Sequence, residues 1–286
     1  MAIFSVLVLV HGRTEHLRRL LAGVDASDLR PAEVVIVYMN EPSPAPMQCV
    51  VPLRTVHISS SQSHSGLPLA RARNAAAAAA QSANLVFLDV DSIPSANLFA
   101  TFMQVLSEGK VLAMAEPRYL KKPLDSTLRM NDETLLEGSV QHHTRKGLPR
   151  ESTMSAHAMF WSLGFAIHAS AFADVGGFDE GYSGYGGEDT DFAFRIREAG
   201  IPVQFVDAPV FHQHHGVYSP PLNHFLAIID NARLFHVRWS VWPMEGWLNA
   251  FVHRGLIAWT PSQSSLIVQR MPTPQEVESA RSSAAY

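Results

Sequence analysis

The first half of the chain alternates short apolar runs with stretches that carry apolar residues at helical spacing. The apolar runs are 4–10, 34–38, 51–58, 85–88 and 111–116, and the helical stretches are 15–21, 69–81 and 97–106. A chain that alternates in this way pairs its strands mainly in parallel and packs helices on both faces of the sheet. We therefore predict an α/β fold with a mixed, mainly parallel sheet, whose ligands bind at the carboxyl ends of the strands.

The second half follows a different pattern. Residues 117–155 are polar, mixed in charge and weakly periodic, and we expect a variable excursion or a flexible loop there. Order returns in the segment 160–167, followed by helices at 169–175 and 190–199, a strand at 202–206 and a helix at 222–235.

The C-terminal part, 221–286, predicts a helical extension beyond a domain that covers 1–220. Residues 239–259 contain four tryptophans and a phenylalanine. Few basic residues flank this segment, so a lid packed on the main domain is favoured over a helix that lies on a membrane surface. Residues 273–276 (TPQE) have the form of a helix capping box.

The composition excludes several classes of protein. A net charge of −4 without a long basic run argues against a nucleic-acid partner. The single Cys49 excludes an intrachain disulfide and fits a reducing compartment. The apolar run 3–10 is far shorter than the ~20 residues of a membrane span and lacks the basic flank of a signal peptide. We expect a cytoplasmic protein, with peripheral contact to the inner membrane face as the alternative.

A buried strand that ends in spaced carboxylates is the first candidate site. The run Leu85–Leu88 leads directly into Asp89, Val90 and Asp91, and Pro94 is expected to end the strand pairing. Carboxylates at a strand end can hold a divalent cation. Because alternate residues of an extended chain point to opposite sides, we expect Asp91 to be a direct ligand and Asp89 to contact a ribose or a metal-bound water. A pair of solvated turn carboxylates is the alternative.

A second acidic cluster follows a glycine-rich turn. Residues 184–191 (GYGGEDTD) place Glu188, Asp189 and Asp191 at the start of a predicted helix, where one of them could act as a general base. Helix capping is the alternative, because an acid in the first turn offsets the helix dipole by about 0.3–1 kcal/mol. One cap, however, does not need three acids, and the glycines indicate a close backbone approach to another group.

Polar side chains at other strand ends complete the candidates. His212, His214 and His215 follow the strand 202–206, and imidazole combined with carboxylate oxygen suits Mn²⁺. An exposed loop cluster is the alternative for these histidines. The N-terminus of a helix attracts anions, and a basic residue beside such an N-terminus is therefore a candidate for a contact to a diphosphate. These are Arg13 after the first strand and Arg71 and Arg73 at the alanine-rich helix, with Asn40 and Glu41 as base or ribose contacts after the second strand.

Three sequence blocks, taken in order, resemble glycosyltransferases of the GT-A fold. They are GRTEHL at 12–17, VFLDVDSIP at 86–94, and GGFD at 176–179 leading to GGEDTD at 186–191. The first half resembles glycosyltransferase family 2, and the last block also resembles the β-1,4-galactosyltransferases. Together the blocks and their spacing cover residue 3 to about residue 215.

The resemblance implies a GT-A (Rossmann-like) mixed, mainly parallel sheet flanked by helices. Residues 1–116 would form the nucleotide-sugar-binding half and 117–220 the acceptor and metal half. It also implies the roles of individual residues. Asp91 and His212, with His214 as a further candidate, would ligate Mn²⁺ or Mg²⁺, and Asp189 would be the base. The acceptor would be bound by Glu188, Tyr185 and Asp191, with Tyr185 stacking on it. Donor contacts would come from His11, Arg13, Asn40, Glu41, Arg71, Arg73, Asp89, Val90 and Asp91.

The chain also departs from the galactosyltransferases. Pro209 stands where they have a methionine ligand, and Thr190 replaces an acidic residue, which puts a preference for N-acetylated acceptors in doubt. Their membrane anchor and disulfides are missing, which favours a soluble enzyme of the bacterial type.

These features together predict an inverting, metal-dependent transfer from a UDP-sugar to a hydroxyl of a glycan or small-molecule acceptor, with a GDP-sugar as the second choice of donor. One alternative is a retaining transferase of the same fold, in which the acids of 188–191 only bind substrate. Another is a non-catalytic nucleotide-sugar-binding module, which would have lost a ligand or the base. A nucleotidyltransferase is disfavoured because a glycine-rich, lysine-containing loop does not follow the first strand.

Overall fold

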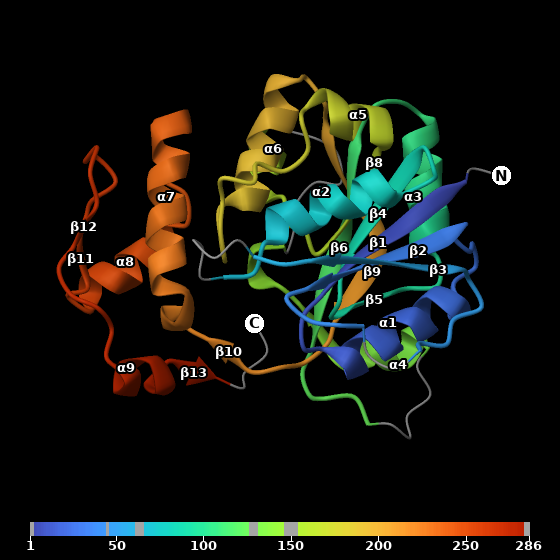
Figure 1. Cartoon of the computed structure of the whole chain (residues 1–286), viewed down its shortest axis with the longest axis horizontal. Helices are drawn as coiled ribbons and strands as arrows, with labels where there is room; N and C mark the ends of the chain where they lie inside the picture. Colours follow the sequence, from blue (N-terminus) through green and yellow to red (C-terminus); the bar gives the residue numbers. More distant parts are fainter. Residues whose placement is uncertain (1–2, 44–45, 61–65, 126–130, 146–153, 283–286) are drawn as a thin grey trace.

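One large sheet organises the protein (Figure 1). The computed structural model describes residues 3–43, 46–60, 66–125, 131–145 and 154–282. Within these residues nine strands form one sheet in the order β3-β2-β1-β4-β8-β6-β9-β5, with β7 paired to β6. The strands are β1 Phe4–Val10, β2 Glu33–Met39, β3 Leu53–Ile58, β4 Asn84–Asp89, β5 Ser92–Pro94, β6 Leu112–Leu120, β7 Ser139–Gln141, β8 Gly164–His168 and β9 Val203–His212.

The strand directions place several strand ends at one edge of the sheet. β1 pairs in parallel with both β2 and β4, and β2 pairs in parallel with β3. β8 runs antiparallel to β4 and β6, whereas β6 and β9 are parallel. The predicted mixed, mainly parallel sheet is therefore confirmed. Because β1, β2 and β4 share a direction, the side chains that follow them meet at the same edge.

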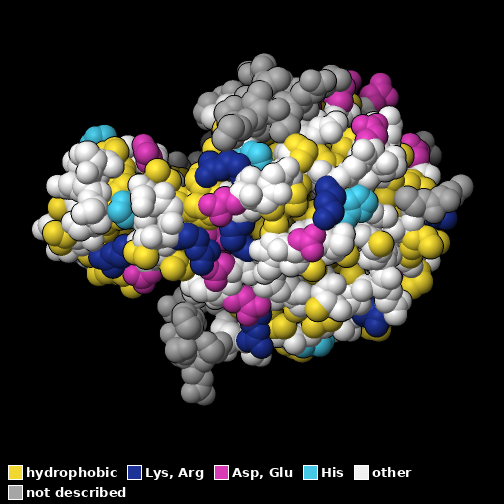
Figure 2. All heavy atoms as spheres, turned by 90° about the horizontal axis from the view of Figure 1, so that it is seen from above, with side chains coloured by type: hydrophobic (Ala, Val, Ile, Leu, Met, Phe, Trp, Pro, Cys, Tyr) yellow, Lys and Arg dark blue, Asp and Glu magenta, His cyan; other side chains and the backbone are white. Residues whose placement is uncertain are grey.

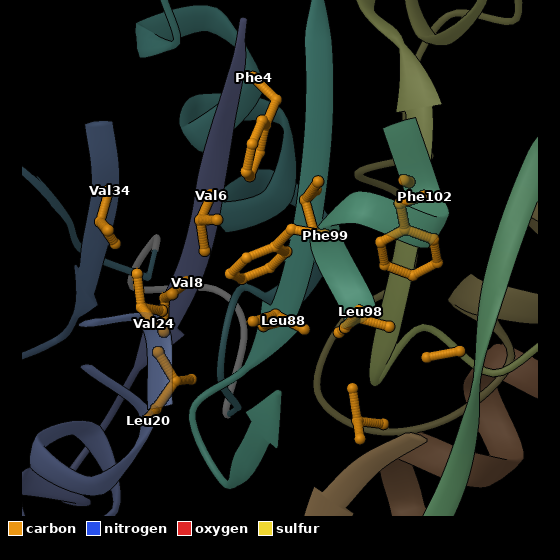
Figure 3. Packing of buried hydrophobic residues seen from close by; sticks show 14 of the residues in the cluster. Phe4, Val6, Val8, Leu20, Val24, Val34, Leu88, Leu98, Phe99 and Phe102 are labelled. Atoms are coloured by element: carbon orange, nitrogen blue, oxygen red, sulfur yellow. The ribbon is translucent and has the colours of Figure 1, made fainter. Parts of the chain in front are cut away.

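Helices cover both faces of the sheet, as the alternation of strand and helix predicts. They are α1 Thr14–Ala26, α2 Leu69–Ala79, α3 Leu98–Ser107, α4 Asp132–Glu137, α5 Ala169–Asp174 and α6 Glu188–Glu198. Successive strand residues point to opposite faces. Val6 and Val8 accordingly pack with α1 and α3 in one apolar cluster (Figure 3), and Leu7 and Leu9 pack with α2, α5 and α6 in another.

A helical extension follows the sheet and has an apolar cluster of its own. It contains α7 Phe225–Trp239, α8 Glu245–His253 and α9 Pro274–Ser279, with short strand pairs β10 Val217–Tyr218 with β13 Arg281–Ser282 and β11 Ile257–Ala258 with β12 Ile267–Val268. Trp242 and Trp259 are only 7% and 3% exposed within this cluster. The predicted capping box is confirmed, since Thr273 and Glu276 bond reciprocally at the start of α9. Among the described residues, no helix is both long and apolar enough to cross a membrane.

Two expectations about the second half need correction. The segment 117–155 is not a loop throughout, because β6 continues to Leu120 and α4 and β7 occupy much of 132–141. The parts of it at 126–130 and 146–153 lie outside the described residues. The strand predicted at 202–206 extends to His212, past Pro209, which pairs beside an irregularity between Met114 and Glu116. In the first half, Pro94 is the last residue of the short edge strand β5, so the strand pairing ends at this proline as expected.

Candidate active site

A cavity of about 780 Å³ lies at the carboxyl ends of β1 and β4, between the sheet domain and the helical extension. We call it the central cavity. Its sheet side is lined by His11, Arg13, Asp89, Val90, Asp91, Tyr119, His142, Trp161, His212 and His215. The segment 184–191 and the helical extension add further lining residues, namely Tyr185, Gly186, Gly187, Glu188, Asp189, Thr190, Met244 and Trp247. The two acidic motifs, about a hundred residues apart in the sequence, therefore line one cavity.

Asp91, His212 and His215 form an Asp–His cluster on the sheet side. One ligand atom from each residue lies within 4.8 Å of the others. Nε2 of His212 is 3.6 Å from Oδ1 of Asp91, and Nε2 of His215 is 3.3 Å from Oδ2. The end of β9 supplies His212, and its pairing with β5 places His212 opposite Ser92, beside Asp91. His215, and not His214, completes the group among the described residues.

The chemistry of the Asp–His cluster fits a divalent cation. Burial, then His215 and Arg13, lowers the pKa of His212 to about 3, and burial is also the main cause that lowers the pKa of His215. Both imidazoles are therefore neutral at pH 7, which is the form that binds metals. Nε2 of His215 is buried and makes no hydrogen bond. One carboxylate with two neutral imidazoles suits Mn²⁺ or Zn²⁺.

Arg13 and His11 lie beside the cluster, at the end of β1. The guanidinium of Arg13 contacts the carboxylate of Asp91 and neutralises it. Nδ1 of His11 is 2.7 Å from the carbonyl oxygen of Met39, and its side chain remains 44% exposed. This edge of the cavity therefore combines a cation, imidazoles and a carboxylate within reach of an anionic ligand.

The acidic loop, residues 184–191, lines the same cavity as the cluster. Gly184, Gly186 and Gly187 all have positive φ, between 73° and 94°, which favours glycine. A Cβ at Gly186 would lie 2.6 Å from Sδ of Met244. The buried Asn231 of α7 also holds the loop, since its Nδ2 donates to the carbonyl oxygen of Gly186 at 2.8 Å. The close approach predicted from the glycines is therefore to the helical extension.

Asp189 has the properties of a general base. It lines the cavity from the first turn of α6, half-buried. Burial, then the neighbouring Glu188, raises its pKa to about 7, whereas Arg73 acts in the opposite direction. A carboxyl group with a pKa near the working pH is a stronger base than an ordinary carboxylate and is still ionised in about half of the molecules, so it can accept a proton from a substrate hydroxyl.

Arg73 links the two acidic motifs. It is 3% exposed, with Nη1 3.2 Å from Oε1 of Glu188 and Nη2 3.4 Å from Oδ1 of Asp89. Its guanidinium lies over the ring of Phe178, 4.9 Å from the centroid. Burial alone would lower the pKa of Arg73, but the nearby carboxylates raise it overall. Arg73 was predicted as a diphosphate contact, and the structure places it between carboxylates.

Asp191 does not face the acceptor side of the cavity, so its predicted acceptor contact needs correction. It is fully buried. Its carboxylate accepts hydrogen bonds from Tyr182 Oη at 3.2 Å, Arg195 Nε at 2.9 Å, Arg238 Nη1 at 2.7 Å and Trp239 Nε1 at 2.9 Å. Arg238, which also pairs with Asp179, and Trp239 belong to α7, so Asp191 joins α6 to the extension. Figure 2 shows charged side chains gathered where the two parts meet.

Four other predicted contacts lie outside the cavity lining. Arg71 donates from Nη1 to the carbonyl oxygen of Ser59 at 3.1 Å. Oδ1 of Asn40 accepts from the backbone N–H of Ser60 at 2.6 Å, and Oε2 of Glu41 accepts from that of Gly12 at 2.7 Å. These three side chains thus brace the loops after β1, β2 and β3. His214 is the fourth.

Several lining residues were not singled out from the sequence. His215 was noted only as part of the histidine run. Trp161 and Met244 are cavity-lining residues that carry no motif, and Trp247 was seen only as one aromatic of the extension. When an aromatic residue belongs to no sequence motif, the sequence does not show whether its side chain lines a cavity or packs in the core.

The fold and the site together define a glycosyltransferase of the GT-A class. A sequence model of the family described as glycosyltransferase like family 2 matches residues 29–217, and the chain belongs to this family of enzymes. The fold is similar to that of S. aureus TarS 1–349, with a TM-score of 0.57 and 16% identity over 82% of this chain and 64% of that one. It is also similar to GalNAc-T7 in complex with UDP, GalNAc and Mn²⁺, with a TM-score of 0.58 and 16% identity over 82% of this chain and 50% of that one.

A curated relative matches a short segment only. The validoxylamine A glucosyltransferase of Streptomyces hygroscopicus subsp. jinggangensis is 46% identical over 44 residues, which are 15% of this chain and 10% of that protein. The chain thus matches about a tenth of this relative's length and spans less than two thirds of the TarS fragment.

Proposed function

We propose that the protein transfers a sugar from a UDP-sugar to an acceptor hydroxyl with inversion at the anomeric carbon. The observation that carries this proposal is the central cavity, which is lined by both the Asp–His cluster and Asp189. In this proposal the cluster holds the leaving group and Asp189 is the base, so that the acceptor attacks from the face opposite the departing diphosphate.

The sheet side is proposed to bind the donor. Asp91, His212 and His215 would hold Mn²⁺, or Mg²⁺, and a cation bound there would stabilise the negative charge that builds on the departing UDP. Arg13, which contacts Asp91, would supply positive charge for the diphosphate. The choice of UDP is supported by similar folds whose structures hold UDP, UDP-GlcNAc, or UDP with GalNAc and Mn²⁺.

The acidic loop is proposed to serve the acceptor. Asp189 takes the proton of the acceptor hydroxyl as its oxygen attacks the anomeric carbon, and the bond from that carbon to the diphosphate oxygen breaks with its electron pair. A positioned base of this kind contributes a factor of about 10²–10⁴ to the rate. Glu188, next to Asp189, would hold the acceptor through its hydroxyls. Arg73 keeps Glu188 in place.

The proposal is tested by measuring UDP release from UDP-glucose, UDP-GlcNAc and UDP-GalNAc with a mixed panel of glycoside acceptors. We expect release that requires Mn²⁺ or Mg²⁺ and stops with EDTA, and that disappears in Asp189→Asn. Equal release with and without the metal, or full activity of Asp189→Asn, would contradict the proposal. Asp174→Asn, which removes an exposed carboxylate from the ion pair with Lys110, is the matched control.

A further inference from the structure

His16 places a third imidazole beside the Asp–His cluster. It lies in the first turn of α1, within the GRTEHL block of the sequence, and the proposed function gives it no role. Its ring approaches that of His215 edge-on, with centroids 6.2 Å apart and an interplanar angle of 67°. Its Nε2 atom is buried and makes no hydrogen bond to any described residue. A buried ring nitrogen thus lies unpaired next to the candidate metal ligands.

His215 is held so that its own Nε2 stays available to a ligand. Nδ1 of His215 is 2.9 Å from the carbonyl oxygen of Gly216, and because a carbonyl oxygen only accepts, Nδ1 carries the hydrogen. Nε2 then has its lone pair, and it lies 3.3 Å from Oδ2 of Asp91. A metal-ligating histidine is typically oriented in this way, by a hydrogen bond from its other ring nitrogen. The ring that His16 contacts is therefore prepared as a ligand.

Gln213 fixes His16 relative to this ring. It is 2% exposed and stands in the chain between His212 and His215. Its backbone N–H donates to the carbonyl oxygen of Asp91 at 2.7 Å, and its side-chain Nε2 donates to the carbonyl oxygen of His16 at 3.0 Å. Its Oε1 is buried and, within the described part of the chain, has no hydrogen-bond partner. One residue thus connects the histidine segment, the end of the β4 turn and the first turn of α1.

The unpaired atoms indicate a partner that the chain does not supply, because buried polar atoms in proteins nearly always have one. Mn²⁺ favours octahedral coordination and Mg²⁺ usually keeps several waters, whereas the Asp–His cluster offers three ligand atoms. We propose that His16 is a positioning residue of the cation site, whose Nε2 accepts a hydrogen bond from a water held by the cation. Gln213 keeps His16 in place for this contact. The inference rests on the proposed function, because it needs the cation that the Asp–His cluster would bind.

A titration of Mn²⁺ into the full-length protein with UDP tests the proposal, with free Mn²⁺ followed by electron paramagnetic resonance. Losing an outer hydrogen bond of a metal site costs about 10–100-fold in affinity. His16→Phe keeps a ring edge against His215 but removes the nitrogen, so it should raise the Kd for Mn²⁺ roughly tenfold. His16→Gln offers an amide oxygen as acceptor and should recover part of the affinity.

The exchange of bound water gives a second readout, which support of the fold alone would not change. Relaxation of the solvent water should show faster exchange of Mn²⁺-bound water in His16→Phe than in wild type. His253→Phe, which replaces an exposed histidine of α8 outside the cavity lining, is the matched control and should behave like wild type in both measurements. His16→Leu replaces the phenylalanine variant if that variant does not fold.

Two results would overturn the inference while the wild type still binds Mn²⁺. The first is unchanged affinity and water exchange in His16→Phe and His16→Leu. The second is equal weakening by His16→Phe and His16→Gln, which would assign the effect to the shape of the imidazole and not to its nitrogen. A wild-type protein that binds neither Mn²⁺ nor Mg²⁺ in the presence of UDP would instead refute the cation site of the proposed function itself.

Discussion

Replacing Arg73 by methionine tests how the two acidic motifs are held together. The change keeps much of the side-chain volume but removes the only guanidinium that contacts both Glu188 and Asp89 among the described residues. Removing one partner of a buried ion pair costs about 3–5 kcal/mol. The Asp89 carboxylate is 37% exposed and is screened by water, whereas Glu188 is only 9% exposed. The loss is therefore dominated by Glu188, and we expect about 3 kcal/mol, the lower end of that range.

Replacing Arg73 by methionine should also change the pKa of the proposed base, Asp189. Arg73 acts against the rise in the pKa of Asp189, so its removal should raise that pKa further above about 7. The free energy of unfolding, from urea denaturation, and the pH profile of UDP release measure the two effects. Arg73→Lys is the matched control, because it keeps the charge and should recover part of both. If Arg73→Met left the stability and the pH profile unchanged but abolished UDP binding, the residue would be the diphosphate contact that the sequence first indicated.

Four further predictions concern the base, its neighbour Glu188 and the metal ligands. Asp189→Asn should lower the transfer rate by about two to four orders of magnitude and leave the UDP affinity near wild type. Glu188→Gln should mainly raise the KM for the acceptor, and steady-state kinetics distinguish the two variants. In wild type, kcat/KM should rise with pH through about pH 7 as Asp189 loses its proton. The pKa of Asp189 is higher in the folded state than in the unfolded state. Its contribution to stability is therefore fully present below about pH 4, where Asp189 is protonated in both states, and is lost as the pH rises through about 7. Thermal unfolding should accordingly show that Asp189→Asn gains stability relative to wild type between about pH 5 and pH 8. Asp91→Ala, His212→Ala and His215→Ala should each abolish Mn²⁺-dependent UDP binding in calorimetry, whereas His214→Ala should have little effect; equal loss in all four would speak against the Asp–His cluster.

The sequence predicts the centre of the sheet well because β1, β2 and β4 are nearly continuous apolar runs. In β1 and β4, burial on both faces leaves Ser5 as the one polar residue inside the strands, so both the element and its place in the core can be read from composition. The end of β4 likewise places Asp89 and Asp91 at the cavity, because strand ends in a parallel sheet share an edge. These inferences depend only on local pattern and on general rules of topology.

The side-chain partners at the site depend on contacts that the local sequence does not encode. Asp191 and Asp189 lie two residues apart on α6, yet one faces the cavity and the other is buried against Arg238 and Trp239 of α7. The choice between His214 and His215 depends on how the chain turns after β9. The place of Trp247 in the cavity lining depends on the packing of α8 against Gly186, about 60 residues earlier in the chain.

The anomeric configuration of the first product tests the central claim most directly. Incubating the protein and Mn²⁺ with a UDP-α-sugar, with water or a pyranoside as acceptor, gives a product that proton NMR can follow from the first minutes. Inverting transfer predicts that the β-configured product appears first, and that hydrolysis then yields the α form only by slow mutarotation. An α-configured product from the start would contradict inversion and make the acids of the acidic loop substrate-binding groups of a retaining enzyme.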